Sequence, residues 1–171
     1  MNLSAIEPVS LHNATIKSSA RQVATKKSSA RQKATKKSSV RPMKMLLVED
    51  STLLREVLFE TINNLKNISV VGMAATQTKA ISLLKETQFD ILLLDIELYD
   101  GSGFGVVKYT KQANYPFKTP ILMLLTNHTT PQYLSLAKDL GVDYYFDKSM
   151  QFDLAIKAIE LEAARFSKRL N

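Results

Sequence analysis

Five polar residues stand close after short apolar runs of this sequence, and their types suit one kind of chemistry. They are three carboxylates, one hydroxyl and one ammonium: Glu49, Asp50, Asp95, Thr126 and Lys148. Carboxylate oxygens are hard ligands of the kind that Mg²⁺ prefers. Carboxylates gathered at one point repel each other, so a divalent cation or a lysine must lie beside them to keep them ionised.

Such a site can accept a phosphoryl group. Asp95 ends the run expected to form the middle strand, which makes it the best-placed nucleophile for an aspartyl phosphate. Mg²⁺ and Lys148 would neutralise charge on the transferring oxygens, and the Thr126 hydroxyl could donate to the acquired phosphate. The chain has no glycine-rich phosphate loop, so we expect the phosphate to come from a partner.

Each residue taken singly also has an ordinary interpretation. An acidic pair after a strand is often a solvated turn, and a lone Asp or Thr there often caps a helix. Lys148 alone would be a surface charge. The functional interpretation depends on all of these residues following separate strands, which chance rarely produces.

The elements that position these residues alternate between strand and helix. Short apolar runs predict buried strands at 45–48, 68–73, 91–94, 121–125 and 142–146. Helices follow each run, with Ser51 and Thr130 as expected caps and Gly141 as an expected helix end. The first helix has expected apolar positions that include Leu54, Val57 and Leu58. Five such units predict a doubly wound parallel α/β sheet, whose ligand site lies at the carboxyl ends of the strands.

The composition limits the class of protein. The 171 residues include no cysteine, which excludes a disulfide framework and a thiolate zinc site. No apolar run is long enough to span a membrane, and the first residues lack the pattern of a secretory signal. We therefore expect a cytoplasmic protein without a membrane contact.

Residues 1–43 differ from the rest of the chain in charge. They hold nine Lys and Arg against one acid, whereas residues 44–171 hold fourteen Lys and Arg against fifteen acids. A ten-residue unit that begins at Lys17 recurs at Lys27, and residues 17–42 contain no Leu, Ile, Met or aromatic residue. Burial there cannot offset the entropy of ordering, so we expect a disordered basic tail over 1–43 and one folded domain over 44–171.

Three interpretations of the tail stay open. Its cations can displace counterions from nucleic acid, which predicts a weak contact through residues 17–41. It can be a solvated arm without a dedicated partner. It can also be a non-native extension, because Met43-Lys44-Met45 is similar to a natural start.

Four motifs carry the residues of the predicted site. They are Leu46-Leu47-Val48-Glu49-Asp50-Ser51, Leu93-Leu94-Asp95 with Gly103 eight residues on, Leu125-Thr126, and Tyr145-Phe146-Asp147-Lys148. As a set they make residues 44–168 resemble the receiver domain of two-component response regulators, and in particular stand-alone bacterial receivers. The resemblance implies a flavodoxin-like fold with strand order 2-1-3-4-5, and phosphorylation of Asp95 by a histidine kinase or phosphotransfer protein.

The resemblance also implies roles for the site residues. The implied Mg²⁺ ligands are Asp50, Asp95 and the backbone carbonyl of Glu97, with Glu49 in the outer part of the acidic pocket. Thr126 and Tyr145 match the family's switch pair, whose movement remodels the face made by helix 4, strand 5 and helix 5. An output protein would bind that face, and the chain would be a monomer or a phosphorylation-dependent dimer.

Several positions depart from the family's usual pattern. Tyr99 and Ser149 stand where proline is usual, and Asn127 stands where a small residue is common. Asn127 could narrow access to the phosphate or hydrogen-bond to it. Glu97 and His128 lie near the expected path of an attacking water, and we expect them to affect the lifetime of the phosphate.

Three classes of function fit these observations. The first is a stand-alone signalling module that is not an enzyme, with no second folded domain after residue 171. The alternative is a nucleic-acid-associated regulator whose basic tail contacts DNA. A third is an enzyme of the haloacid-dehalogenase type, which usually has a second Asp two residues after its nucleophile, where this chain has Glu97.

Overall fold

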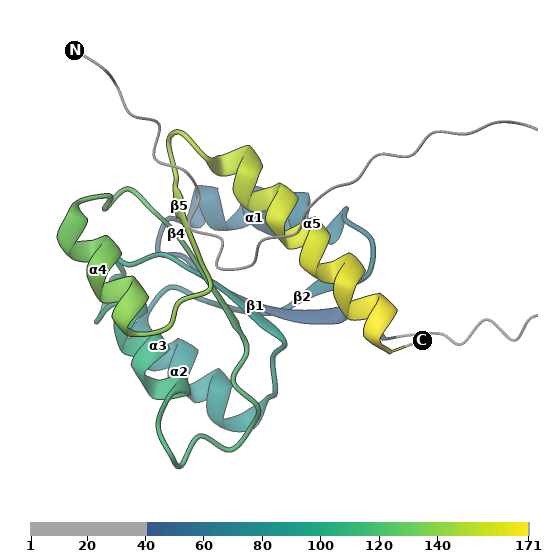
Figure 1. Cartoon of the computed structure of the whole chain (residues 1–171), viewed down its shortest axis with the longest axis horizontal. Helices are drawn as coiled ribbons and strands as arrows, with labels where there is room; N and C mark the ends of the chain where they lie inside the picture. The colour runs from purple at the N-terminus through teal and green to yellow at the C-terminus, as the bar shows by residue number, and fades with distance from the viewer. Residues whose placement is uncertain (1–40, 171) are drawn as a thin grey trace, which may run out of the picture.

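A central sheet lies between two layers of helices in the computed structural model, which describes residues 41–170 (Figure 1). Five parallel strands form the sheet in the order β2-β1-β3-β4-β5. The strands are β1 (Met43–Val48), β2 (Ile68–Ala74), β3 (Ile91–Leu94), β4 (Ile121–Thr126) and β5 (Tyr144–Asp147). The helices are α1 (Thr52–Asn63), α2 (Gln77–Glu86), α3 (Gly103–Thr110), α4 (Pro131–Asp139) and α5 (Phe152–Arg169). The predicted flavodoxin-like fold and its strand order are confirmed.

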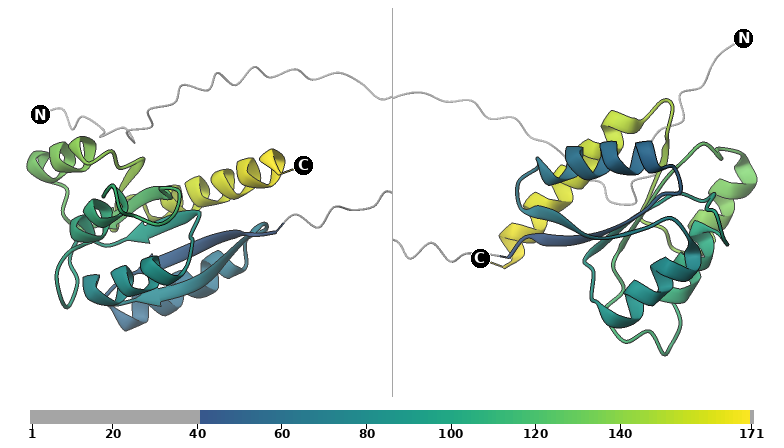
Figure 2. Two further views of the ribbon diagram at one scale, coloured as in Figure 1. Left: turned by 90° about the horizontal axis from the view of Figure 1, so that it is seen from below. Right: turned by 180° about the vertical axis from the view of Figure 1, so that it is seen from behind.

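The core has two halves, one on each face of the sheet. On β1, Met45 and Leu47 pack in the half covered by α1 and α5, whereas Leu46 and Val48 pack in the half covered by α2, α3 and α4. Figure 2 shows these two helical layers from two further directions. Because both faces of an inner strand are buried, the run 91–94 is apolar throughout and has no polar alternation.

The helix ends agree with most of the local predictions. The Ser51 hydroxyl caps α1 by accepting from the Leu54 N–H, and Gly141 follows α4 with a φ of 66°. Thr130 does precede α4, but its side chain makes no capping hydrogen bond, so that expectation was wrong. Val57 is also 44% exposed, because the buried stripe of α1 runs through Leu58 and faces away from it.

The first described residues are tied to the amino end of the sheet. β1 begins at Met43, one residue before the predicted domain boundary. The Arg41 guanidinium donates to both carboxylate oxygens of Asp90, at 2.6 and 2.9 Å, and lies over the Phe166 ring at 4.9 Å. Burial would raise the pKa of Asp90, but hydrogen bonds from Arg41 and from the Lys44 N–H hold it below its ordinary value.

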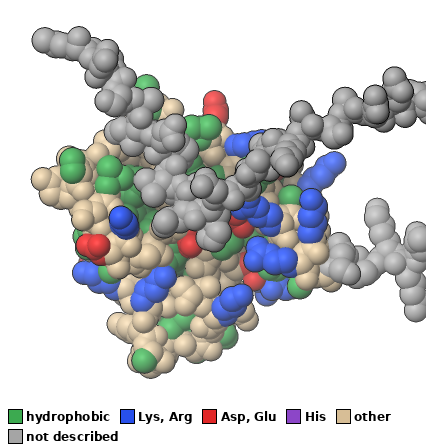
Figure 3. Space-filling view, viewed as in Figure 1, with side chains coloured by type: hydrophobic (Ala, Val, Ile, Leu, Met, Phe, Trp, Pro, Cys, Tyr) green, Lys and Arg blue, Asp and Glu red, His purple; other side chains and the backbone are tan. Residues whose placement is uncertain are grey.

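The predicted disordered tail and most of its predicted nucleic-acid contact lie outside the described residues. Arg41, the last residue of the predicted contact segment, is already engaged by Asp90. In Figure 3, Lys and Arg side chains gather on the side of the domain where α5 lies. Among residues 41–170, no helix combines the length and the apolar character needed to cross a bilayer.

Candidate functional site

The acidic residues meet because their strands are neighbours. β1 pairs with β3 so that Val48 lies opposite Leu94, and the Asp95 N–H donates to the Val48 carbonyl at 2.8 Å. One carboxylate oxygen from each of Glu49, Asp50 and Asp95 lies within 4.8 Å of the others. Glu49 and Asp95 are buried and Asp50 is partly exposed. The structure therefore brings the three predicted carboxylates into one pocket.

Lys148 enters this pocket from the far side of the sheet. Its N–H donates to the Thr126 carbonyl at 3.0 Å, which places it at the end of β5 beside β4. Its Nζ lies 2.5 Å from Asp95 Oδ2 and 2.8 Å from Glu49 Oε2. Burial alone would lower the pKa of Lys148, but the hydrogen bonds to the two carboxylates outweigh it and raise the pKa. Burial raises the pKa of Glu49, and Lys148 offsets this only in part.

The pocket has the charge and the donor atoms that suit a small divalent cation. Its three carboxylates and one ammonium leave two formal negative charges. Asp95 Oδ2 binds Lys148, but Asp95 Oδ1 is buried and accepts no hydrogen bond from any described residue. A buried carboxylate oxygen without a partner is costly. A hard cation such as Mg²⁺, bound by oxygen atoms, would satisfy both the charge and this oxygen.

Glu97 lies in the loop between β3 and α3, two residues beyond Asp95. An isolated antiparallel bridge to Ser102 holds its backbone, and the role of its carbonyl as a Mg²⁺ ligand stays a prediction. Its side chain is bound to His128, with 3.0 Å between Glu97 Oε2 and His128 Nε2. This pair links the loop after β3 to the loop after β4. The expected effect of both residues on phosphate lifetime also stays a prediction.

Thr126 and Tyr145 are both bound to the backbone of His128. The Thr126 hydroxyl accepts from the His128 N–H at 3.3 Å, and the Tyr145 hydroxyl donates to the His128 carbonyl. Both residues are buried. A movement of the Thr126 hydroxyl would therefore be felt by the peptide that also holds Tyr145, which is what a switch pair requires.

The burial of Tyr145 predicts a loss of stability at alkaline pH. Burial, with smaller contributions from Tyr133, Asp147 and Asp95, raises its pKa from 10.0 to about 12. Because the unfolded chain loses this phenol proton first, the stabilisation is complete below pH 10 and is lost between pH 10 and pH 12. We expect a Tyr145→Phe variant to lose about 2 kcal/mol less than the wild type over this window.

Urea unfolding at several pH values measures this difference. Tyr99→Phe is the matched control, because Tyr99 is 73% exposed. An identical pH dependence for the wild type and both variants would contradict the assignment.

The residues that depart from the family pattern contact one another. The Ser149 hydroxyl donates to Asn127 Oδ1 at 3.2 Å, which joins the loops after β4 and β5. The predicted hydrogen bond from Asn127 to a phosphate stays a prediction. None of the peptide bonds of residues 41–170 is cis, including the bond that precedes Ser149.

Two supporting features of the site were not identified from the sequence. A side chain at Gly103 would place its Cβ 2.1 Å from the Asp95 carbonyl oxygen, so only glycine lets α3 begin so close to the phosphoacceptor. The Asp147 carboxylate accepts the N–H groups of Ser149 and Met150, at 2.7 and 3.0 Å, and so orders the loop that carries Lys148. The spacing of Gly103 from Asp95 was the visible signal for the first feature.

A family model described as the response regulator receiver domain matches residues 45–160. A curated protein-glutamate methylesterase/protein-glutamine glutaminase 2 from Vibrio vulnificus (strain YJ016) is 32% identical over 108 residues. The match covers 63% of this chain and 31% of that protein. A second such protein, from Saccharophagus degradans, is 26% identical, with 73% and 36% covered. The chain thus spans about a third of the length of these curated relatives.

Solved structures show the same fold. A CheY-like response regulator receiver domain protein from Methanospirillum hungatei JF-1 is similar with a TM-score of 0.63 and 18% identity, over 75% of this chain and 98% of that chain. A two-component response regulator of the LuxR family from Aurantimonas sp. SI85-9A1 has a TM-score of 0.64 and 25% identity, over 72% and 86%.

Proposed function

The chain belongs to the response regulator receiver domain family, and from that premise we propose that it is the phosphoacceptor of a two-component relay. Asp95 takes a phosphoryl group from a histidine kinase or a phosphotransfer protein, and the modification switches a protein-interaction face. The observation that carries the proposal is the buried, unpartnered Oδ1 of Asp95 beside a lysine and two more carboxylates. We place this activity in the cytoplasm, where a histidine kinase would have access to it.

In the proposed reaction, Asp95 Oδ1 attacks the phosphorus of a phosphohistidine. The O–P bond forms as the N–P bond breaks, and the departing imidazole nitrogen keeps the electron pair. Lys148 balances charge on the transferred oxygens, and the Thr126 hydroxyl donates to one of them. Mg²⁺, held by Asp50 and Asp95, would supply further neutralisation of the phosphoryl oxygens when bound.

The phosphate then shifts an equilibrium between two arrangements. It adds up to about two negative charges and three acceptor oxygens to a small pocket. The Thr126 hydroxyl, which binds the His128 N–H before modification, turns toward the phosphate instead. Because Tyr145 is bound to the same residue, the change reaches the face formed by α4, β5 and α5, where the output protein binds. Dimerisation on phosphorylation would use the same face.

Phosphorylation of the full chain by a small acyl phosphate in the presence of Mg²⁺ tests the proposal. We expect one added phosphoryl group by intact mass, mapped to Asp95, stable in acid and labile in base. The absence of an adduct in repeated trials with and without Mg²⁺ would contradict it. We propose that the chain loses its own phosphate without turning over other substrates. Steady hydrolysis of small phosphate esters would favour an enzyme of the haloacid-dehalogenase type instead.

Apolar side chains at the mouth of the pocket favour a protein as the phosphoryl donor. Leu53, Tyr99 and Met150 are 74%, 73% and 82% exposed, and each lies two to four residues after a residue of the site. Exposed apolar side chains around a polar centre are typical of a protein-binding surface. We expect Leu53→Ser combined with Met150→Ser to slow phosphorylation by the cognate protein donor at least about tenfold, the cost of one buried anchor.

The rate of phosphorylation by a small acyl phosphate should be unchanged in this double variant, because that donor needs no docking surface. Leu161→Ser, on the far part of α5 and 49% exposed, is the control. Equal losses with both donors would show damage to the site itself.

The charge of residues 17–41 supports a second candidate, a contact between the tail and nucleic acid. Such binding would weaken steeply with salt, because it depends on the release of counterions. A salt titration of DNA binding with the full chain and with a chain lacking residues 1–42 distinguishes this candidate from the signalling module alone. Equal binding by the two chains would exclude the tail as the contact.

A further inference from the structure

We propose that Arg55 is a positioning residue, which aims the metal ligand Asp50 by holding the backbone on either side of it. The inference rests on the proposed Mg²⁺ site and extends it to a residue of α1 that faces the protein rather than the metal. It concerns affinity for the cation, and it can be tested without phosphorylation.

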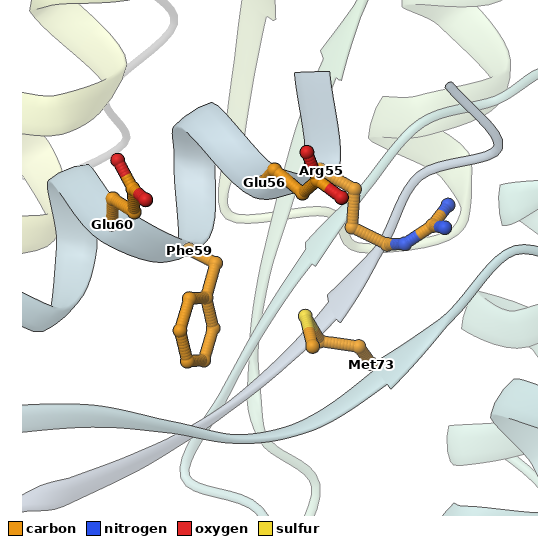
Figure 4. Close-up of a pocket in the computed structure, with 5 residues that line it drawn as sticks. All are labelled: Arg55, Glu56, Phe59, Glu60 and Met73. Carbon is orange, nitrogen blue, oxygen red and sulfur yellow. The ribbon is translucent and has the colours of Figure 1, made fainter. Parts of the chain in front are cut away.

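The guanidinium of Arg55 turns back from the first turn of α1 onto the loop after β1. Its Nη1 donates to the carbonyl oxygens of Glu49, at 2.6 Å, and Asp50, at 3.2 Å, and its Nη2 donates to Thr52 Oγ1 at 3.3 Å. Figure 4 shows the side chain extending away from Phe59, along one wall of an open pocket between α1 and β2. One planar group thus spans the loop from the end of the strand to the start of the helix.

Asp50 needs such support more than its neighbour does. The Glu49 carboxylate is fixed twice, by Lys148 at 2.8 Å and by the Ser51 N–H at 3.2 Å. The ion pairs of Lys148 go to Glu49 and Asp95 and leave out Asp50. The hydrogen bond that restrains Asp50 reaches its backbone carbonyl, and it comes from Arg55. The direction of the Asp50 carboxylate therefore depends on a peptide that Arg55 holds.

Charge and geometry make opposite predictions for the removal of Arg55. As a charge, a guanidinium beside the pocket repels a cation, so its loss would tighten Mg²⁺ binding. As a support, it orders a ligand, so its loss would weaken binding, as the loss of outer-shell partners does at other metal sites. The sign of the change separates the two effects.

Calorimetric titration of the full, unphosphorylated chain with Mg²⁺ is the test. We expect Arg55→Met to weaken Mg²⁺ affinity about tenfold. Arg55→Lys keeps the charge but cannot span two carbonyls, so we expect it to weaken affinity too, by a smaller factor. Arg165→Met, which removes a guanidinium paired with Glu162 on α5, should leave the affinity unchanged. Thermal unfolding without metal shows whether each variant folds.

Tighter binding by Arg55→Met would overturn the proposal in favour of a pure charge effect. Unchanged affinity together with a lower melting temperature would overturn it in favour of a purely structural role. A wild-type chain that does not bind Mg²⁺ would overturn the metal site and this role together. A wild-type chain that binds, with variants that bind equally well, would overturn the role of Arg55 alone.

Discussion

Asp95→Asn is expected to abolish phosphorylation while leaving the domain folded. An amide oxygen is a poor nucleophile, and Asp95 supplies the one buried acidic oxygen without a partner in the described part of the chain. The substitution keeps the shape of the side chain and removes one of three clustered negative charges, so the free energy of unfolding should not fall by more than about 1 kcal/mol. Intact mass after incubation with Mg²⁺ and a small acyl phosphate measures the loss of label.

Asp100→Asn is the matched control for this experiment. Asp100 lies in the same loop, is exposed, and binds Thr78 at 2.7 Å instead of Lys148. It should be labelled to the same extent as the wild type. Label that survives in Asp95→Asn would point to another acceptor, and loss of label in both variants would point to damage to the loop.

Lys148→Met is expected to cause the largest loss of stability. Lys148 is 12% exposed and neutralises two carboxylates that are 2% and 6% exposed. Removal of one partner of a buried ion pair leaves uncompensated charge and costs about 3 kcal/mol. Mg²⁺ should restore part of this loss, because it can replace the missing positive charge. Phosphorylation should also slow strongly, since the transferred oxygens lose a neutralising group.

The loss in Lys148→Met should also depend on pH in a definite direction. Burial already raises the pKa of Glu49, and removal of Lys148 raises it further. A carboxyl with a raised folded pKa contributes stability in acid that is lost as pH rises through that pKa. The variant should therefore approach wild-type stability in acid and fall furthest below it at neutral pH.

Urea unfolding at acidic and neutral pH, with and without Mg²⁺, measures these differences. Lys157→Met is the control, because its pair with Glu160 is exposed on both sides and contributes little. Similar losses in the two variants, or a loss that does not change with pH, would contradict the role given to Lys148.

The sequence was sufficient for the parts of the site that follow from sheet topology. Apolar runs end at Val48, Leu94 and Phe146, and in a parallel sheet such ends lie at one edge, which is why Glu49, Asp95 and Lys148 could be placed together. The pattern was weaker at strand ends, where Met43 and Thr126 join their strands through pairing with neighbours. Val57 shows the limit of periodicity, because an apolar residue on the flank of a helix need not be buried.

Contacts between loops could not be predicted in this way. The pairs Glu97–His128 and Asn127–Ser149 join segments far apart in the sequence, and their partners depend on the paths of three loops. Arg55 was missed because an arginine at the start of an amphipathic helix is usually solvated, and nothing in its spacing shows that it turns back toward the strand. Local patterns record burial, whereas these bonds depend on tertiary geometry.

The clamp between Arg41 and Asp90 fixes where the chain enters the fold. Strands of a parallel sheet run in one direction, so this entry lies about 20 Å from the acidic pocket, the length of a six-residue strand. A fluorophore, a resin or a sensor chip attached upstream of residue 41 would thus be tethered at the opposite pole from the aspartate. Immobilised that way, the protein should leave its reactive mouth open to an incoming kinase.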